Sequence, residues 1–218
     1  MRSITRFALF LLIGAVAATA GARTAPEALA PSLADPVLYE VDTEHSAVLF
    51  KVRHMAISTV TGRFNRFAAT FWYDPANPSA TRVTATIDVA SVDTDNERRD
   101  NHLRSEDFFF AEQHPTITFA SREVRSTGEG AFEVLGDLTI RGVTLPITLD
   151  VELEGSGTTG RGEPIIGLVA EGEINRHDYG LRWNRVVETG AVVGDDVRIV
   201  LEIEAKGPPA GGAAAGAR

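Results

Sequence analysis

Five histidines are the side chains in this sequence that could most directly hold a metal ion. No two of them stand at the HxH or HxxxH spacing that presents two imidazoles on one face of a strand or a helix, and the chain has no cysteine to add a thiolate. The sequence therefore predicts no metal site and no cofactor, although convergence of three histidines in the folded chain stays open. These residues are His45, His54, His102, His114 and His177.

A second candidate chemistry is nucleophilic catalysis, because Asp42, His45 and Ser46 supply the side-chain types of a serine hydrolase. Adjacent residues of a strand point to opposite faces, so His45 cannot readily take a proton from Ser46. The chain also lacks the GxSxG turn that exposes a serine nucleophile. We interpret the three residues as turn and strand-start residues, assign no catalytic residue, and predict that the protein is not an enzyme.

Segment 95–110 holds the densest cluster of charges and ends in three phenylalanines. One interpretation is a solvated helix face on which arginines pair with acids. The other is that His102 or Arg104 stands at the mouth of a binding site and meets a polar or phosphorylated head group, with Phe108 as a hydrophobic wall. The irregular segment 175–194 is open to a similar role. It carries Arg176, His177, Tyr179 and Trp183.

These two segments interrupt a chain whose apolar residues recur at every second position. This period is typical of strands with one buried and one solvated face. Together with turn signals such as Asp74-Pro75 and Arg141-Gly142, it predicts eight strands and a tight hairpin at residues 141–142. The predicted strands span residues 48–54, 63–73, 83–89, 115–125, 130–140, 143–154, 165–175 and 197–203.

Without a strand–helix–strand rhythm, eight such strands predict an all-β fold with antiparallel pairing. A closed barrel and a two-sheet sandwich both satisfy the pattern. One short helix is predicted within residues 95–110. The strands are short and lack aromatic girdles, which favours a soluble barrel with an apolar interior over an outer-membrane barrel. A soluble barrel of this size can enclose one small ligand.

Both ends of the chain differ in composition from the middle. Residues 1–22 combine a basic start, an apolar run and small residues, which predicts a cleaved secretory signal peptide. An uncleaved anchor is the alternative, although the run is shorter than a membrane span. Residues 23–37 are predicted to be a linker, and the Gly-, Ala- and Pro-rich residues 207–218 a disordered tail. The folded unit is then 38–206, in a periplasmic or secreted protein.

The formal net charge of −9 and the absence of cysteine set further limits. An acidic chain offers no positive field to attract phosphates, which argues against nucleic acid and against an anionic membrane surface as partners. Without cysteine there are no disulfides, so an exported barrel would depend on strand pairing and apolar packing alone.

A series of short motifs resembles the YceI family. The motifs follow the expected order across residues 39–206, and only small departures occur, such as Phe110 where an aspartate is more usual and Tyr179 where a phenylalanine is common. Each motif is weak alone, but the ordered set is specific. The motifs are YEVD at 39–42, HS at 45–46, FKVRH at 50–54, GRF at 62–64, RDNHLRSEDFF at 99–109, PTITF at 115–119, GDLTIRGVT at 136–144, INRHDYGL at 174–181 and VGDDV at 193–197.

The resemblance implies an eight-stranded, lipocalin-like antiparallel barrel that is exported in bacteria and binds a long isoprenoid chain as a carrier. We expect no membrane-spanning segment, and transient membrane contact and a homodimer stay open. The ligand-binding residues expected on this basis are Phe50, Val52, His54, Phe64, Phe67, Phe71, Ile87, His102, Arg104, Phe108, Phe119, Leu138, Leu149, Ile174 and Trp183.

Three alternatives stay open at this point. His54 is either an imidazole at the edge of the core, bonded to backbone, or a polar group that holds a ligand head. The protein could instead be a hydrolase or transferase that acts on the head group of a prenyl lipid. It could also be a structural envelope module whose barrel holds no ligand.

Overall fold

The structure, a computed structural model, describes residues 36–74, 77–187 and 190–209. The predicted signal peptide lies outside the described residues, as do the predicted linker up to residue 35 and the predicted tail from residue 210. The first strand begins at Val37 and the last ends at Lys206. Gly207, assigned to the tail, is instead tied to the barrel, because its amide donates to the carbonyl of Pro164 at 2.8 Å.

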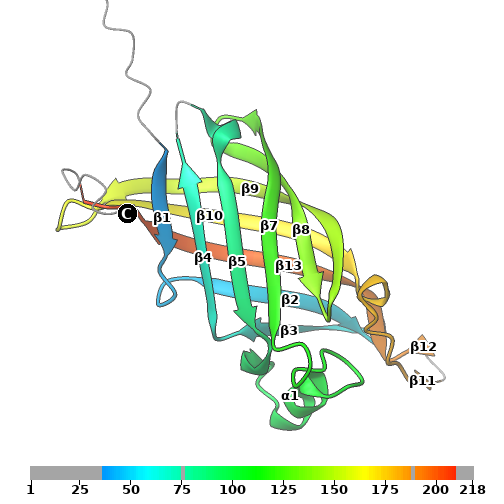
Figure 1. The fold of residues 1–218 in the computed structure, drawn as a ribbon. Coiled ribbons are helices and arrows are strands. Elements are labelled where there is room, and N and C mark those ends of the chain that lie inside the picture. Colours follow the sequence, from blue (N-terminus) through cyan, green and yellow to red (C-terminus); the bar gives the residue numbers. More distant parts are fainter. Residues whose placement is uncertain (1–35, 75–76, 188–189, 210–218) are drawn as a thin grey trace, which may run out of the picture. The chain divides into compact units, whose positions relative to one another are not determined.

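The chain is mostly strand, with one short α-helix and three turns of 3₁₀ helix (Figure 1). In order, the elements are β1 (Val37–Val41), β2 (Ala47–His54), β3 (Ser58–Phe64), β4 (Phe67–Tyr73), η1 (Pro78–Ala80), β5 (Arg82–Asp88), η2 (Val89–Ser91), β6 (Val92–Asp93), α1 (Glu97–Arg104), β7 (Thr116–Gly128), β8 (Ala131–Ile140), β9 (Val143–Thr158), β10 (Pro164–Asn175), η3 (Arg176–Tyr179), β11 (Val186–Val187), β12 (Gly190–Ala191) and β13 (Val193–Lys206).

Three barrel strands are each divided into two pieces. β1 and β2 form one interrupted strand, which pairs antiparallel with the interrupted strand made of β3 and β4. β5 and β6 in turn pair with β4 and β3. The predicted strand 63–73 was therefore too short at its start, because its first piece begins at Ser58 and the break falls at residues 65–66.

The last strand closes the sheet on itself. β13 pairs with β10 on one side and with both β1 and β2 on the other, as Val41 opposite Ala205 and Leu49 opposite Val200 show. Between them, β5, β7, β8, β9 and β10 follow one another as antiparallel neighbours. The predicted eight-stranded antiparallel barrel is confirmed, and the sandwich alternative is wrong. β11 and β12 form a separate two-stranded hairpin.

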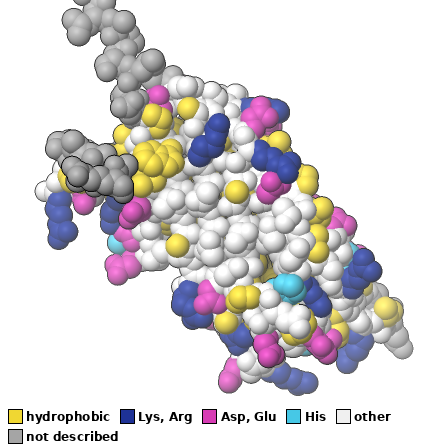
Figure 2. Space-filling model, viewed as in Figure 1, with side chains coloured by type: hydrophobic (Ala, Val, Ile, Leu, Met, Phe, Trp, Pro, Cys, Tyr) yellow, Lys and Arg dark blue, Asp and Glu magenta, His cyan; other side chains and the backbone are white. Residues whose placement is uncertain are grey.

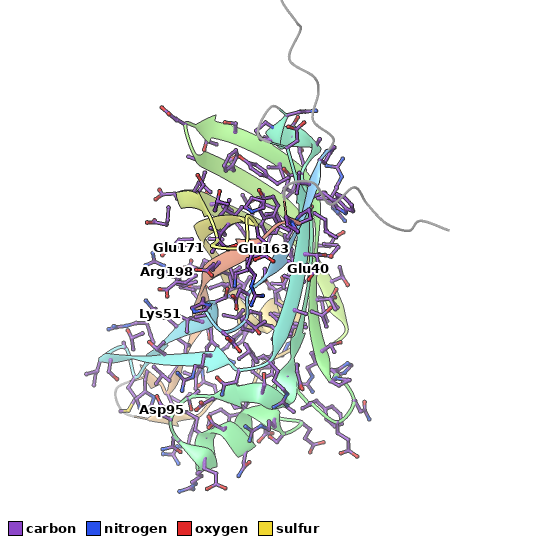
Figure 3. The ribbon with its side chains drawn as sticks, turned by 90° about the vertical axis from the view of Figure 1, so that its left-hand side faces the viewer. Glu40, Lys51, Asp95, Glu163, Glu171 and Arg198 are labelled. Carbon is purple, nitrogen blue, oxygen red and sulfur yellow. The ribbon has the colours of Figure 1, made fainter. Side chains whose placement is uncertain are left out.

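The period-two pattern of the sequence becomes the two faces of the wall. The predicted hairpin forms around Arg141 (φ 51°) and Gly142 (φ 75°), which are the positive angles that a tight turn between twisted strands requires. On the outer face, Arg198 of β13 stands opposite Lys51 of β2 and forms an ion pair with Glu171 of β10 (Figure 3). Charges of both signs are spread over the visible surface (Figure 2).

Two inward-facing glycines make room for aromatic rings. The ring of Phe50 lies 2.2 Å from where a Cβ of Gly62 would stand, and the ring of Phe119 lies 2.3 Å from the corresponding point at Gly136. Each phenylalanine sits on the strand paired with its glycine. The rings thereby lie flat against the wall and leave space toward the barrel axis.

The predicted helix is confirmed as α1, although it is shorter than the segment 95–110. The side chain of Asn96 caps its first turn by accepting from the amide of Arg99 at 3.0 Å. Asp100 is buried and accepts from the amide and hydroxyl of Thr94 at 2.9 and 2.5 Å, which ties the helix to the end of β6. In the described part of the chain, no helix is both long and apolar enough to span a membrane.

Candidate functional site

The barrel encloses a cavity of about 280 Å³ whose wall is almost entirely apolar. Side chains from every long strand line it, in the alternation that faces one side of each strand inward. Among the lining residues only Tyr73, Thr81 and Arg176 carry polar side-chain groups. The wall therefore suits a long apolar molecule, with little to hold a charged one.

Most of the residues predicted to bind ligand contribute to this wall. Their inward placement follows from the strand period, because each lies on the apolar side of its strand, or in the segment after α1 in the case of Phe108. Ligand contact by these residues stays a prediction. The eleven are Phe50, Val52, Phe64, Phe67, Phe71, Ile87, Phe108, Phe119, Leu138, Leu149 and Ile174.

The other four predicted residues, His54, His102, Arg104 and Trp183, are not among the lining residues. All four lie at one end of the barrel, which we call the cap end; it carries α1, residues 105–115, η3 and the β11–β12 hairpin (Figure 1). His54, the last residue of β2, pairs with Ser58 and Val193 in the ladder. A head-group contact by His54 stays a prediction.

His102 and Trp183 pack together outside the cavity. The ring of His102 meets those of Trp183 and Phe108 edge-on, with centroids 4.7 and 5.0 Å apart, and its Nε2 lies 2.9 Å from Oδ2 of Asp107. This cluster joins the segment after α1 to the loop after η3. Phe108 also lines the cavity, so the cluster closes the cap end from outside.

Arg104 binds backbone rather than facing a ligand. Its Nε donates to the carbonyl of Ala90 at 2.9 Å and its Nη2 to that of Val92 at 2.7 Å. Arg99 does the same for Thr94, donating to its hydroxyl and its carbonyl, both at 2.7 Å. Segment 95–110 was interpreted either as a solvated helix face or as the mouth of a binding site. Neither interpretation includes what the structure shows, which is that two of its arginines fasten α1 to the rim of the barrel.

Arg176 holds the second irregular segment in the same way and is 3% exposed. Its guanidinium donates to the carbonyls of Leu181, Trp183, Val193 and Gly194 and to Oδ1 of Asp195. These contacts use all five donors of the group. Burial lowers the pKa of Arg176, and the charge of Asp195 opposes that effect. The sequence left Arg176 open to a head-group contact from this irregular segment, but it gave no signal that the side chain is buried and bonded to backbone carbonyls.

The opposite end, which we call the hairpin end, holds the turns between β7 and β8 and between β9 and β10. Tyr39 stacks on Phe71 with centroids 5.4 Å apart and an interplanar angle of 5°. Both rings are buried in a second apolar cluster with Ile166 and Ala205. Burial raises the pKa of Tyr39. Phe71 lines the cavity, so this stack adjoins the cavity at the hairpin end.

One group among the described residues has the donor types of a metal site, which the histidine spacing did not reveal. Single ligand atoms of Asp42, His45 and Glu204 lie within 4.8 Å of one another. The Lys206 ammonium already binds Asp42, and with the His45 ring it holds the pKa of that carboxyl well below its usual range. Because Lys206 supplies a cation to both acids, the cluster is an ionic tie between the β1–β2 turn and β13.

A closed antiparallel barrel around an apolar cavity is an architecture that can hold an apolar molecule in its interior. Comparison with known proteins makes this more specific. The model of the YceI-like domain matches residues 39–205, so the chain belongs to the YceI family.

The relatives and solved structures agree with this assignment. A UPF0312 protein of Staphylococcus epidermidis is 39% identical over 168 residues, covering 76% of this chain and 95% of the relative. A UPF0312 protein of Pectobacterium atrosepticum is 36% identical, with 79% and 87% covered. Among solved structures, BcnA of Burkholderia cenocepacia has a TM-score of 0.68 at 26% identity, covering 75% of this chain and 98% of that one.

A third structural comparison shows the fold alone. A domain from Saccharophagus degradans, described as polyisoprenoid binding, has a TM-score of 0.55 at 16% identity, with 79% of this chain and 99% of that one covered.

Proposed function

We propose that this protein is exported and carries or stores an isoprenoid lipid inside its barrel. The observation that carries the proposal is the cavity: a lining drawn from every long strand, with polar side-chain groups only at Tyr73, Thr81 and Arg176. The basic and apolar pattern of residues 1–22 supports export. The binding described for the Saccharophagus degradans domain supports the choice of ligand.

The chemistry of the wall favours a chain bound by its tail. Each buried CH₂ contributes roughly 0.8 kcal/mol, so a prenyl chain gains enough from a dry interior to be held without ionic contacts. Arg176, the charged residue of the lining, has no free donor for a phosphate, because its five donors are bonded within the protein. We therefore expect prenols and isoprenoid quinones to bind better than prenyl pyrophosphates.

Organic extraction of protein purified from its native host, followed by mass spectrometry, tests the proposal. We expect one isoprenoid species in near-stoichiometric amount. The native host matters because a foreign host could load a substitute lipid. Recovery of folded protein with no lipid in the extract would contradict the proposal and favour a ligand-free structural module.

Two substitutions at neighbouring positions of β7 test whether the extracted lipid was bound in the cavity. Phe119→Asp places a charge in the apolar wall and should abolish loading, because an unpaired carboxylate is strongly disfavoured there. Thr118→Asp, on the exposed face of the same strand, should load like the wild type. Circular dichroism of both variants checks that the barrel is intact. Equal loading of the two would show that the lipid binds elsewhere.

A further inference from the structure

The turn between β2 and β3 departs from the residue types that such turns normally select. His54 pairs with Ser58, so Met55, Ala56 and Ile57 make the connection. Met55 and Ala56 have φ angles of 52° and 56°. Side chains other than glycine lose on the order of 1 kcal/mol each in this region, and tight hairpins prefer Asn-Gly there. The turn holds apolar side chains at a cost to its own stability, which indicates a role outside the fold.

This turn joins a second exposed apolar element. The amide of Met55 donates to the carbonyl of Val192 at 3.0 Å, and the amide of Val192 donates to the carbonyl of Arg185 at 2.9 Å. The β11–β12 hairpin, which begins at Val186, projects from this point at the cap end (Figure 1). Ile57 is 72% exposed and Val186 80% exposed. We name Met55, Ala56, Ile57 and Val186 the apolar tip.

The described charges next to the apolar tip are mainly basic, although the chain as a whole carries −9 and Glu188, which follows Val187, lies outside the described residues. Arg53, Arg182 and Arg185 are exposed, and described residues 53–57 and 182–187 include no acid. Two acids follow on β13, but both are engaged: Asp195 accepts from Arg176 at 3.1 Å and Asp196 from Asn175 at 3.3 Å. Arg53 donates to the hydroxyl of Thr59 and to the carbonyl of Ala56, whereas Arg182 and Arg185 have no acidic partner among the described residues. Exposed aliphatic side chains beside these two arginines fit an anionic lipid surface.

The apolar tip also lies beside the cavity. Val193, the residue after Val192, lines the cavity and stands opposite His54 in the ladder. Val52, two residues before His54 on β2, is also a lining residue. An isoprenoid with negligible solubility in water would exchange most directly where the barrel touches a bilayer. We propose that the apolar tip docks the cap end on anionic phospholipid bilayers, where the bound lipid is exchanged. The exchange of lipid rests on the proposed function, whereas the docking does not.

Flotation of the exported protein with vesicles tests the docking without cargo. Wild type should bind vesicles of phosphatidylcholine mixed with phosphatidylglycerol, and bind phosphatidylcholine alone more weakly. Ile57→Ser combined with Val186→Ser should lower the partition coefficient at least tenfold, because each aliphatic side chain contributes about 1.5 kcal/mol or more when it is fully transferred out of water. Arg182→Gln combined with Arg185→Gln should remove the preference for phosphatidylglycerol. Trp72→Ser, at a 49% exposed apolar residue of β4, should bind like wild type.

A turn repair separates docking from folding. Replacing Met55 with Asn and Ala56 with Gly should raise the melting temperature, because both residues suit positive φ, and should weaken vesicle binding several-fold. A purely structural turn would gain stability and keep its binding.

Three results would overturn the proposal. The first is equal vesicle binding by wild type and the Ile57/Val186 variant, and the second is loss of binding in Trp72→Ser instead. The third is no binding of wild type to any vesicle, which would indicate that the apolar tip contacts a protein partner. The proposed function fails separately, by an extract without lipid.

Discussion

The two ends of the barrel are closed by different means. At the hairpin end, Tyr39 and Phe71 stack inside the wall, and the strands that carry them are barrel strands. At the cap end, α1 and the loop after η3 lie outside the ladder, and arginines tie them to backbone carbonyls of the rim. Opening the hairpin end would break strand pairing. Side-chain bonds contribute more to holding the cap end, so under the proposed function we expect the ligand to enter and leave there.

The largest expected effect tests the hairpin end. Tyr39→Ala should lower the free energy of unfolding by about 3 to 5 kcal/mol, because a buried aromatic ring is lost from the closing strand. Urea denaturation measures it. Trp72→Ala, on the outer face of the adjacent strand, is the control and should cost less than about 1 kcal/mol. Similar losses in the free energy of unfolding for both variants would show that the Tyr39–Phe71 stack does not stabilise the hairpin end.

Arg176→Met comes next and tests the cap end. It leaves buried carbonyls without donors, so we expect a loss of about 2 to 4 kcal/mol. Hydrogen exchange should rise in residues 176–195 before it rises in β7 or β8. Arg176→Lys keeps the charge without the planar fork and should recover only part of the loss. Exchange that rises uniformly around the barrel would mean that the two ends are not independent.

Arg104→Met should have a smaller effect, about 1 to 2 kcal/mol, because it removes two bonds to rim carbonyls and one to the side chain of Asn101 in the same helix. The increase in hydrogen exchange should be confined to α1 and residues 105–109. Arg98→Met, on the exposed side of the same helix, is the matched control and should leave exchange unchanged. If both variants behave alike, the clamp does not hold the cap.

The smallest effect concerns pH at the tie between the β1–β2 turn and β13. The hydrogen bond to Asp42 raises the pKa of His45. The stability this contributes is fully present below the ordinary histidine pKa and is lost as pH rises through the raised value. Titration of the His45 ring by NMR should show a downward shift of its pKa in Asp42→Asn. A midpoint unchanged by that substitution would mean that the contact does not form in solution.

The fold and most of the cavity wall could be predicted because they depend on a local pattern. Phe119 and Leu138 face inward since they occupy alternate positions of strands whose period is visible in the chain. The cap end could not be predicted in the same way. His102, Arg104 and Trp183 are residue types that bind polar ligands, yet here they bind carbonyls, an acid and other rings. Residue type does not say whether a donor finds its partner in the protein or in a ligand.

The sequence by itself determined which face of each strand is apolar, where the helix lies and that the interior is apolar. These features follow from the types of residues that stand a few positions apart in the chain. Only the tertiary structure decided that the sheet closes, since this requires β13 to meet β1 and β2 across most of the chain. The same closure brings Glu204 to Asp42 and His45, and sets Val192 beside Met55. These contacts depend on the register between strands that are far apart in the sequence, and no local period encodes that register.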